Sequence, residues 1–286
     1  MISKAEGVVS SFQFFPLWLA LVFSPGEGTL PLPATNVLAF SSNDVILQVG
    51  EELTYNVSYA HVDVGQVRLK IVEKVNHGGR MCYYAKAYID SYKGVPFVDI
   101  HTLYESDIDT AMYSLRFHSK ERNNSTSPEI VYEFDYPGHE VTITHETLGK
   151  QSARKRDTLR LHTFAQDGLS LFYFARTKLL SNLTMTVPTI VSEKEGNTIM
   201  KFRDERSGEK IDAVEYPVDV IHFEGNAGFV GIVGLSGDFE GWFSNDAARV
   251  PILAKMKVLI GDIRIELMKW KRTGWAPPRF AEGGEK

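Results

Sequence analysis

Apolar and polar residues alternate with a period of two along most of the chain. In the stretch EELTYNVSYAHVDVGQVRLKIVEKV, apolar residues hold every second position on both sides of a polar break at 63–65. Successive side chains of a strand point to opposite faces, so this pattern predicts two strands with one buried face each, joined tightly near the break. The apolar positions are Leu53, Tyr55, Val57 and Tyr59 before the break and Val67, Leu69 and Ile71 after it.

Turn-forming residues separate the strands that follow. The turns NHGGR (76–80) and DSYKGV (90–95) flank the predicted strand MCYYAKAYI. Between two alternating runs in 130–146, Pro137 and Gly138 hold the centre of a turn, which predicts a hairpin of type II. Further strands are predicted in TMTVPTIV, NTIMKFRDER and KIDAVEYPVDVIHFEG.

The last hairpin can be given a register. In IGDI, Gly261 and Asp262 form a two-residue loop of a kind that suits the twist of two strands, so Ile260 pairs with Ile263. This register combines an apolar face with a charge pair. The pairs behind the loop are Val258–Ile265, Met256–Leu267, Lys257–Glu266 and Leu253–Trp270.

One segment has helical spacing. In LSLFYFARTKLLS (169–181), Leu169, Phe172, Tyr173 and Arg176 fall on one helix face. Everything else in the chain reads as strand and turn. We therefore predict an all-β fold with a single antiparallel, strongly curved sheet or incomplete barrel and at most one or two short helices.

The two ends of the chain differ from the middle. The apolar run VVSSFQFFPLWLALVF (8–23) is short for a membrane span and is typical of a secretion signal. We predict a signal peptide over 1–39, with Ala39 as one solution for the cut site and an uncleaved anchor as the alternative. Residues 40–272 are predicted to form one β domain, and the Pro- and Gly-rich residues 273–286 a flexible tail.

Composition narrows the classes of function. Of 286 residues, 43% are apolar, which is enough for a substantial core. Cys82 is the single cysteine, so we exclude an intramolecular disulfide and a cysteine-based metal site and expect a buried, inert thiol. The net charge of −5 does not indicate a protein that binds nucleic acid. The basic cluster KQSARKRD (150–157) is predicted to be a solvated loop.

Known catalytic and metal-binding patterns are missing from the sequence. It holds no Gly-rich phosphate loop, no Gly-x-Ser-x-Gly elbow and no His-Glu-x-x-His motif. His139 and His145 would lie roughly 20 Å apart on one strand, too far to share a metal ion. We therefore expect neither a cofactor nor a metal ion.

The window GDFEGWFSNDAARVP (237–251) carries the strongest candidate chemistry. Asp238, Glu240 and Trp242 alternate, so on a strand they share a face, with the two carboxyl groups about 6–7 Å apart. Two carboxyls beside an aromatic ring are typical of glycan-cleaving enzymes. In that hypothesis Arg176 or Arg249 completes the groove.

A structural interpretation of the same window explains more of its residues. Asp246 can accept backbone amides in a loop, Arg249 can be its ion partner, and Pro251 suits an edge or a bulge. A binding interpretation uses aromatic side chains instead, on a concave sheet face that would take an acyl chain or a glycan. Its residues are Tyr55, Tyr59, Tyr173 and Trp242, with Tyr83 and Phe172 beside them, and an ordinary aromatic core is the alternative.

Four stretches resemble the bacterial envelope proteins grouped as domain of unknown function 3108. These stretches are GEELTYNVSYAHVDVGQVRLKI with EFDY after it, DGLSLFYFART, and GDFEGWFSNDAARVPILAKMKVLIGDIRIEL. The residues that carry the resemblance are Gly50, Glu51, Tyr55, Gly65, Asp167, Ser170, Phe172, Tyr173, Arg176, Thr177, Trp242, Ser244, Asp246, Arg249, Pro251, Gly261, Glu266 and Leu267.

The resemblance implies an exported, mostly antiparallel β fold and no assigned activity. Many relatives have Lys-Gly before the Trp and Asp-Asp after the Ser, whereas this chain has Ser236-Gly237 and Asn245-Asp246. A role of the missing Lys therefore cannot be carried over.

Together these observations favour a protein of the periplasm or outer envelope of a Gram-negative bacterium. We expect it to bind or help assemble an apolar or amphiphilic component, a lipid or a glycan, rather than to catalyse a reaction. The alternatives are a carboxylate-dependent enzyme on an envelope glycan, built from Asp238, Glu240 and Arg176, and a structural module that binds a protein partner. We expect no transmembrane span in the mature chain.

Overall fold

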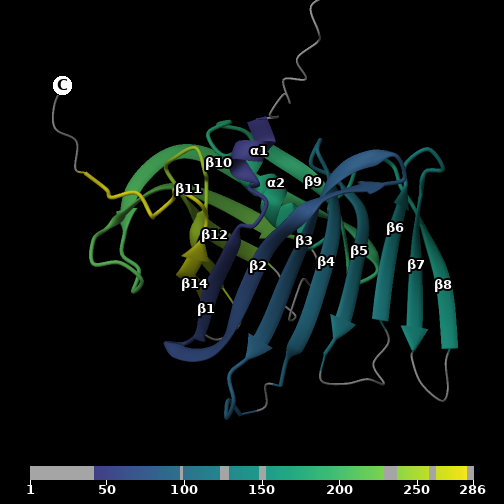
Figure 1. The fold of residues 1–286 in the computed structure, drawn as a ribbon, viewed down its shortest axis with the longest axis horizontal. Helices are drawn as coiled ribbons and strands as arrows, with labels where there is room; N and C mark the ends of the chain where they lie inside the picture. The colour runs from purple at the N-terminus through teal and green to yellow at the C-terminus, as the bar shows by residue number, and fades with distance from the viewer. Residues whose placement is uncertain are drawn as a thin grey trace, which may run out of the picture. The chain divides into compact units, whose positions relative to one another are not determined.

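The computed structural model describes residues 42–96, 99–122, 129–147, 153–228, 237–257 and 262–281. In these residues the chain forms fourteen strands in one antiparallel sheet and two short helices (Figure 1). The elements are α1 (Ser42–Ile46), β1 (Glu52–Tyr59), β2 (Val62–His77), β3 (Arg80–Ser91), β4 (His101–Asp109), β5 (Ser114–Glu121), β6 (Glu129–Asp135), β7 (Glu140–Thr147), β8 (Ala153–Arg160), α2 (Ser170–Lys178), β9 (Thr184–Val191), β10 (Lys194–Glu209), β11 (Val218–Ala227), β12 (Gly237–Ser244), β13 (Pro251–Lys257) and β14 (Asp262–Lys271).

The strand order explains why helix α2 lies on the inner face of the curved sheet. Strands β1 to β8 follow one another as neighbours, β14 pairs with β1, and β13 to β9 continue outward. Strands β8 and β9 are therefore the two edges of the sheet, and the connection between them, which contains α2, must travel from one edge to the other. The predicted all-β, strongly curved and incompletely closed sheet is confirmed.

Curvature brings distant strands together. The backbone N–H of Glu193, between β9 and β10, donates to the Tyr132 hydroxyl on β6 at 3.0 Å, and His145 on β7 contacts the Glu193 carboxylate at 3.1 Å. Helix α2 packs against both halves of the inner face. Its Phe172 ring lies 6.5 Å from the ring of Tyr55 on β1, edge to face.

The first hairpin turns earlier than expected. Its loop is Ala60-His61, with φ of 47° and 67°, the left-handed pair that a two-residue hairpin loop needs. The polar break at 63–65 is a bulge instead, because Val57 pairs with Gly65 while Ser58 pairs with Asp63. The two strands are confirmed and the position of their connection was wrong, since Ala-His carries no turn signal.

The hairpin of β6 and β7 is confirmed, but not its turn type. The His139 N–H donates to the Tyr136 carbonyl across Pro137-Gly138, and the residue with positive φ is His139 rather than Gly138. A type II turn needs positive φ at its third position, so the prediction is wrong on this point. The Asp135 carboxylate, which accepts the Gly138 N–H at 3.0 Å, supports the turn that forms.

The register of the last hairpin differs by four residues from the predicted one. The observed pairs are Leu253–Glu266, Ala254–Ile265, Lys255–Arg264, Met256–Ile263 and Lys257–Asp262. Asp262 therefore belongs to a strand and not to a two-residue loop, and positions 258–261 lie outside the described residues. Because four is even, each residue still faces the side that the predicted register gave it.

Two further segments are more ordered than the sequence indicated. The basic cluster at 153–157 is not a loop but part of β8, which pairs along its length with β7. After β14, the expected tail makes specific contacts: Arg279 bridges to Val218, and the Trp275 indole N–H donates to Asp246 at 2.7 Å. Residues 282–286 lie outside the described part of the chain.

Candidate ligand-binding site

Asp167 fixes the beginning of α2. One carboxylate oxygen accepts the N–H groups of Leu169 and Ser170, at 2.7 and 2.8 Å, and the other accepts the hydroxyls of Ser106 and Ser114, at 2.6 and 2.8 Å. Burial raises the pKa of Asp167, and these four donors oppose the shift. The first turn of α2 is thereby tied to β4 and β5.

A buried ion pair fixes the other end of α2. Arg176 donates to both carboxylate oxygens of Glu51, at 2.6 and 3.1 Å, and neither side chain reaches solvent. Its remaining donors reach the carbonyls of Ala248 and Arg249, at 2.9 and 3.1 Å, and the last carbonyl of α1. Arg272 is a second donor to Glu51. Since every charge here is hydrogen-bonded, the cluster anchors α2 against the inner face.

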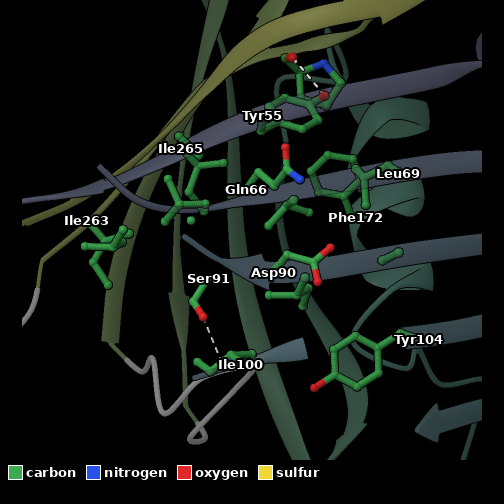
Figure 2. A pocket seen from close by; sticks show the side chains of 18 of the residues that line it. Tyr55, Gln66, Leu69, Asp90, Ser91, Ile100, Tyr104, Phe172, Ile263 and Ile265 are labelled. Carbon is green, nitrogen blue, oxygen red and sulfur yellow. Dashed lines mark hydrogen bonds between the residues drawn. The ribbon is translucent and has the colours of Figure 1, made fainter. Parts of the chain in front are cut away.

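Between the anchored helix and the sheet lies a cavity of about 440 Å³, the first cavity (Figure 2). It extends over β1, β2, β3, β4, β13 and β14 and is bounded by the N-terminal part of α2. The aliphatic residues that line it include Val57, Val67, Leu69, Ile89, Ile263 and Ile265, and the aromatic ones are Tyr55, Tyr59, Tyr104 and Phe172. This is the size and character of a pocket for an apolar ligand.

Small residues leave this space open. Ala87 on β3 and Ala254 on β13 line the first cavity at positions where a larger side chain would fill it. Gly65, at the bulge of β2, packs so closely that a Cβ would lie 2.5 Å from the Asp90 carbonyl oxygen. Bulges sharpen the bend of a sheet, so Gly65 serves the curvature that encloses the cavity.

A second cavity, of about 240 Å³, lies on the other side of α2. Its floor is formed by two reciprocal pairs, in which Phe223 covers Gly241 and Phe239 covers Gly225. The residues that line both cavities are Gly168, Phe172, Pro251, Leu253, Ala254 and Ile265. The two spaces therefore share a wall.

The aromatic residues predicted to bind a ligand separate in the structure. Tyr55 and Tyr59 line the first cavity, and the Tyr55 hydroxyl donates to the Pro251 carbonyl at 3.1 Å. Trp242 borders the second cavity, but its ring is on the outer face, 5.0 Å from the ring of His222, because the next residue, Phe243, packs inward with Phe223. Tyr173 lines neither of the two cavities in the described residues; it is fully buried beside Arg176. The Phe172 ring next to it faces the ligand space instead.

The proposed enzyme groove does not assemble. Asp238 is exposed and accepts a hydrogen bond from Asn226 at 2.7 Å, while Glu240 pairs across the sheet with Glu224. Arg176 is buried against Glu51, with its donors engaged there. Since the intervening Phe239 packs inward with Phe223, both carboxylates point to the outer face, away from α2, although residue Glu240 also borders the second cavity.

The loop after β12 is organised by Asp246. One of its carboxylate oxygens accepts the N–H groups of Ala248 and Arg249 and the hydroxyl of Ser244, at 2.9, 3.1 and 2.8 Å. Within residues 237–257, the Arg249 guanidinium does not pair with Asp246, so the predicted ion pair is wrong. It donates instead to two carbonyls in the last turn of α2, those of Arg176 and Thr177, at 3.3 and 3.1 Å.

Pro251 begins β13 next to a bulge. Phe243 pairs with Pro251 while Trp242 pairs with Leu253, so one residue of β13 is extra. This is a place where a strand tolerates a residue without an N–H.

The outer face carries its own polar cluster. His118 on β5 bridges Glu105 and Glu129, at 2.9 Å each, and Lys86 also pairs with Glu105 at 2.9 Å. The hydrogen bond from His118, together with Lys86 and Tyr84, holds the pKa of Glu105 well below its usual range, although burial opposes this.

The single cysteine, Cys82 on β3, is buried, as the sequence predicted. Burial raises the pKa of its thiol to about 12.

Sequence reasoning missed Glu51 and Arg272 as partners of Arg176. It also did not distinguish the aliphatic residues that line the first cavity, such as Val67 and Ile89, from residues of the packed hydrophobic core. The signal for Glu51 was its place in the Gly-Glu opening shared with the resembled family; the lining residues had only their period-two spacing.

Comparisons with known proteins agree with this architecture. The model of the family described as "Protein of unknown function (DUF3108)" matches residues 54–268. A solved structure described as a beta-barrel-like protein of domain of unknown function DUF1849 from Brucella abortus is similar, with a TM-score of 0.50 and 10% sequence identity, over 78% of this chain and 97% of that chain. At this identity the likeness shows the fold alone. No curated protein matches the sequence.

Proposed function

The chain belongs to the DUF3108 family, and we propose that it is an exported, non-enzymatic envelope protein that holds the apolar part of an amphiphile inside its curved sheet. The single observation that carries the proposal is the first cavity, of about 440 Å³. It is lined by aliphatic and aromatic side chains contributed by six strands and by a helix that is anchored at both ends. The first cavity is partly open to solvent, and a concave apolar space of this size is the usual form of a site for a small apolar ligand.

Its lining favours an acyl chain over a glycan. Sugars need hydrogen-bonding groups along their whole length, whereas the walls here are residues such as Val67, Ile89 and Ile265. Each methylene group moved from water into such a cavity contributes about 0.8 kcal/mol. Ten of them contribute about 8 kcal/mol, which corresponds to a dissociation constant near 1 μM before the loss of ligand freedom is subtracted.

Filling the cavity tests this proposal. Ala87→Phe projects a ring into the first cavity, and Ile89→Phe does so from the same strand if the first variant folds poorly. The matched control is Glu224→Phe, which places the same ring on the outer face. We expect the wild type and the control to bind a dansyl-labelled fatty acid with similar micromolar affinity, and the filled variants to bind at least tenfold more weakly.

Circular dichroism would verify that each variant is folded. No binding by the wild type, or undiminished binding by both folded cavity variants, would refute the proposal.

Export to the envelope is part of the same proposal. It is supported by the apolar run at 8–23 and by the resemblance of the chain to envelope proteins. No helix in the described ranges is long and apolar enough to cross a membrane. Fractionation of cells that produce the full chain, with the mass of the mature N-terminus measured, tests it. A full-length chain that stays in the cytoplasm would contradict export.

A further inference from the structure

We propose that the natural ligand has two apolar chains on one polar head, with one chain in each cavity and the head at a mouth that the cavities share. This inference rests on the proposed function and adds the class of ligand.

Adjacency of the two cavities is the first observation. Six residues line both of them, among them Phe172 on α2 and Ala254 on β13. The Phe172 side chain projects from the helix toward the sheet, with its ring close to Tyr55 (Figure 2). Phe172 therefore forms part of the wall that the two cavities share.

The register of the strands gives the second observation, which is that both cavities reach the same end of the sheet. One hydrogen-bonded row crosses five strands from the first cavity to the second: Tyr59, Ile263, Met256, Phe239 and Gly225. β1 and β13 end beside this row, and β14 and β12 begin beside it. Two chains that enter at this end and diverge on either side of Phe172 would fill both cavities.

At their other end the cavities meet the anchored helix. Asp167 ties the start of α2 to β4 and β5, and Arg176 ties its last turn to Glu51. Opening that end would break a buried ion pair, whereas the row from Tyr59 to Gly225 lies at strand ends. The exposed edge of Tyr59, at 37% of its surface, marks the first cavity's side of the mouth.

Stoichiometry distinguishes two chains from one. Native mass spectrometry would be done with oleate, a single-chain probe, and with dioleoylphosphatidylglycerol, a two-chain probe. We expect the wild type to bind two oleates or one phospholipid, and the phospholipid to displace both oleates.

Variants that fill one cavity at a time sharpen the test. Ala227→Phe projects into the second cavity and Ala87→Phe into the first. Each should reduce the oleate count from two to one and weaken phospholipid binding at least tenfold, while Glu224→Phe on the outer face changes neither. Met200→Phe is the second route into the small cavity if Ala227→Phe does not fold.

The outcomes separate this inference from the proposed function. If the wild type binds neither probe, both fail. If it binds one oleate that Ala87→Phe abolishes and Ala227→Phe does not affect, the first cavity binds a ligand but the two-chain inference is wrong. If either variant abolishes a single bound oleate, one bent chain runs through both cavities, which also overturns it.

Discussion

Arg176 and Glu51, 125 residues apart in the chain, form a two-pronged ion pair that is closed to solvent. Removing the carboxylate would leave Arg176 and Arg272 buried without a counter-charge, and breaking such a pair destabilises a protein by about 3–5 kcal/mol. We expect this loss for Glu51→Gln, measured by denaturant unfolding. Glu52→Gln is the control, because Glu52 pairs with Lys70 near the surface and such pairs contribute about 0–1 kcal/mol. Equal effects of the two changes would contradict the assignment.

Two buried tyrosines should respond in opposite ways to loss of the hydroxyl. Within the described residues the Tyr173 hydroxyl is buried without a hydrogen-bond partner, whereas the Tyr55 hydroxyl donates to the Pro251 carbonyl at 3.1 Å. We expect Tyr173→Phe to leave the thermal midpoint unchanged or higher, and Tyr55→Phe to lose about 1 kcal/mol. A clear loss of stability in Tyr173→Phe would show that its hydroxyl has a partner, such as a bound water.

Stability should fall in acid partly through Glu105. Its pKa in the folded protein lies well below the usual 4.5, chiefly because of the hydrogen bond from His118. The unfolded chain then takes up a proton near pH 4.5 while the folded protein does not, so the stabilisation is present above that pH and is lost as the pH falls further. Unfolding free energies measured from pH 6 to about pH 3 should show a flatter profile for Glu105→Gln than for the wild type. The exposed Glu133 on β6 supplies the control, and an identical profile for Glu105→Gln and Glu133→Gln would rule out this role.

Arg249 should stabilise the end of α2. Its guanidinium donates to the carbonyls of Arg176 and Thr177, so it satisfies groups that a helix leaves unpaired at its C-terminus. We expect Arg249→Ala to lose about 1 kcal/mol, and Arg249→Lys to retain part of the charge interaction. Arg249→Gly separates the backbone contribution, because φ at this position is 47°, a conformation that glycine adopts readily. If Ala and Lys behave alike in chemical denaturation, the contact with the helix end contributes nothing.

Much of the strand pattern could be predicted, because it depends on neighbours in the sequence. The alternation at Tyr55 and Val57, and at Val67 and Leu69, predicted two strands and their buried face. The predicted register of the last hairpin was wrong by four residues, an even number, so each residue was still assigned to the correct face of the sheet. Turn positions were less certain, since the left-handed pair Ala60-His61 has no sequence signal, while the polar residues of a bulge look like a turn.

The candidate site was predicted only in part. Tyr55 and Tyr59 line the first cavity, but the Trp242 ring is on the outer face, and Tyr173 borders neither cavity, although it lies next to Phe172, which borders both. Neighbouring residues of a helix point in different directions, so the rotation of α2 about its axis decides which of them faces the cavity. The spacing of apolar residues in the sequence does not give that rotation.

By itself the sequence determined many of the strands, their inner and outer faces and helix α2, because a period of two or of 3.6 residues is local information. Only the tertiary structure decided that β14 closes on β1, that α2 crosses the inner face, and that Arg176 meets Glu51. Those relationships join residues far apart in the chain, and they depend on how strongly the sheet bends. The cavities follow from the same curvature, since they are the space that remains between a bent sheet and a helix held at both ends.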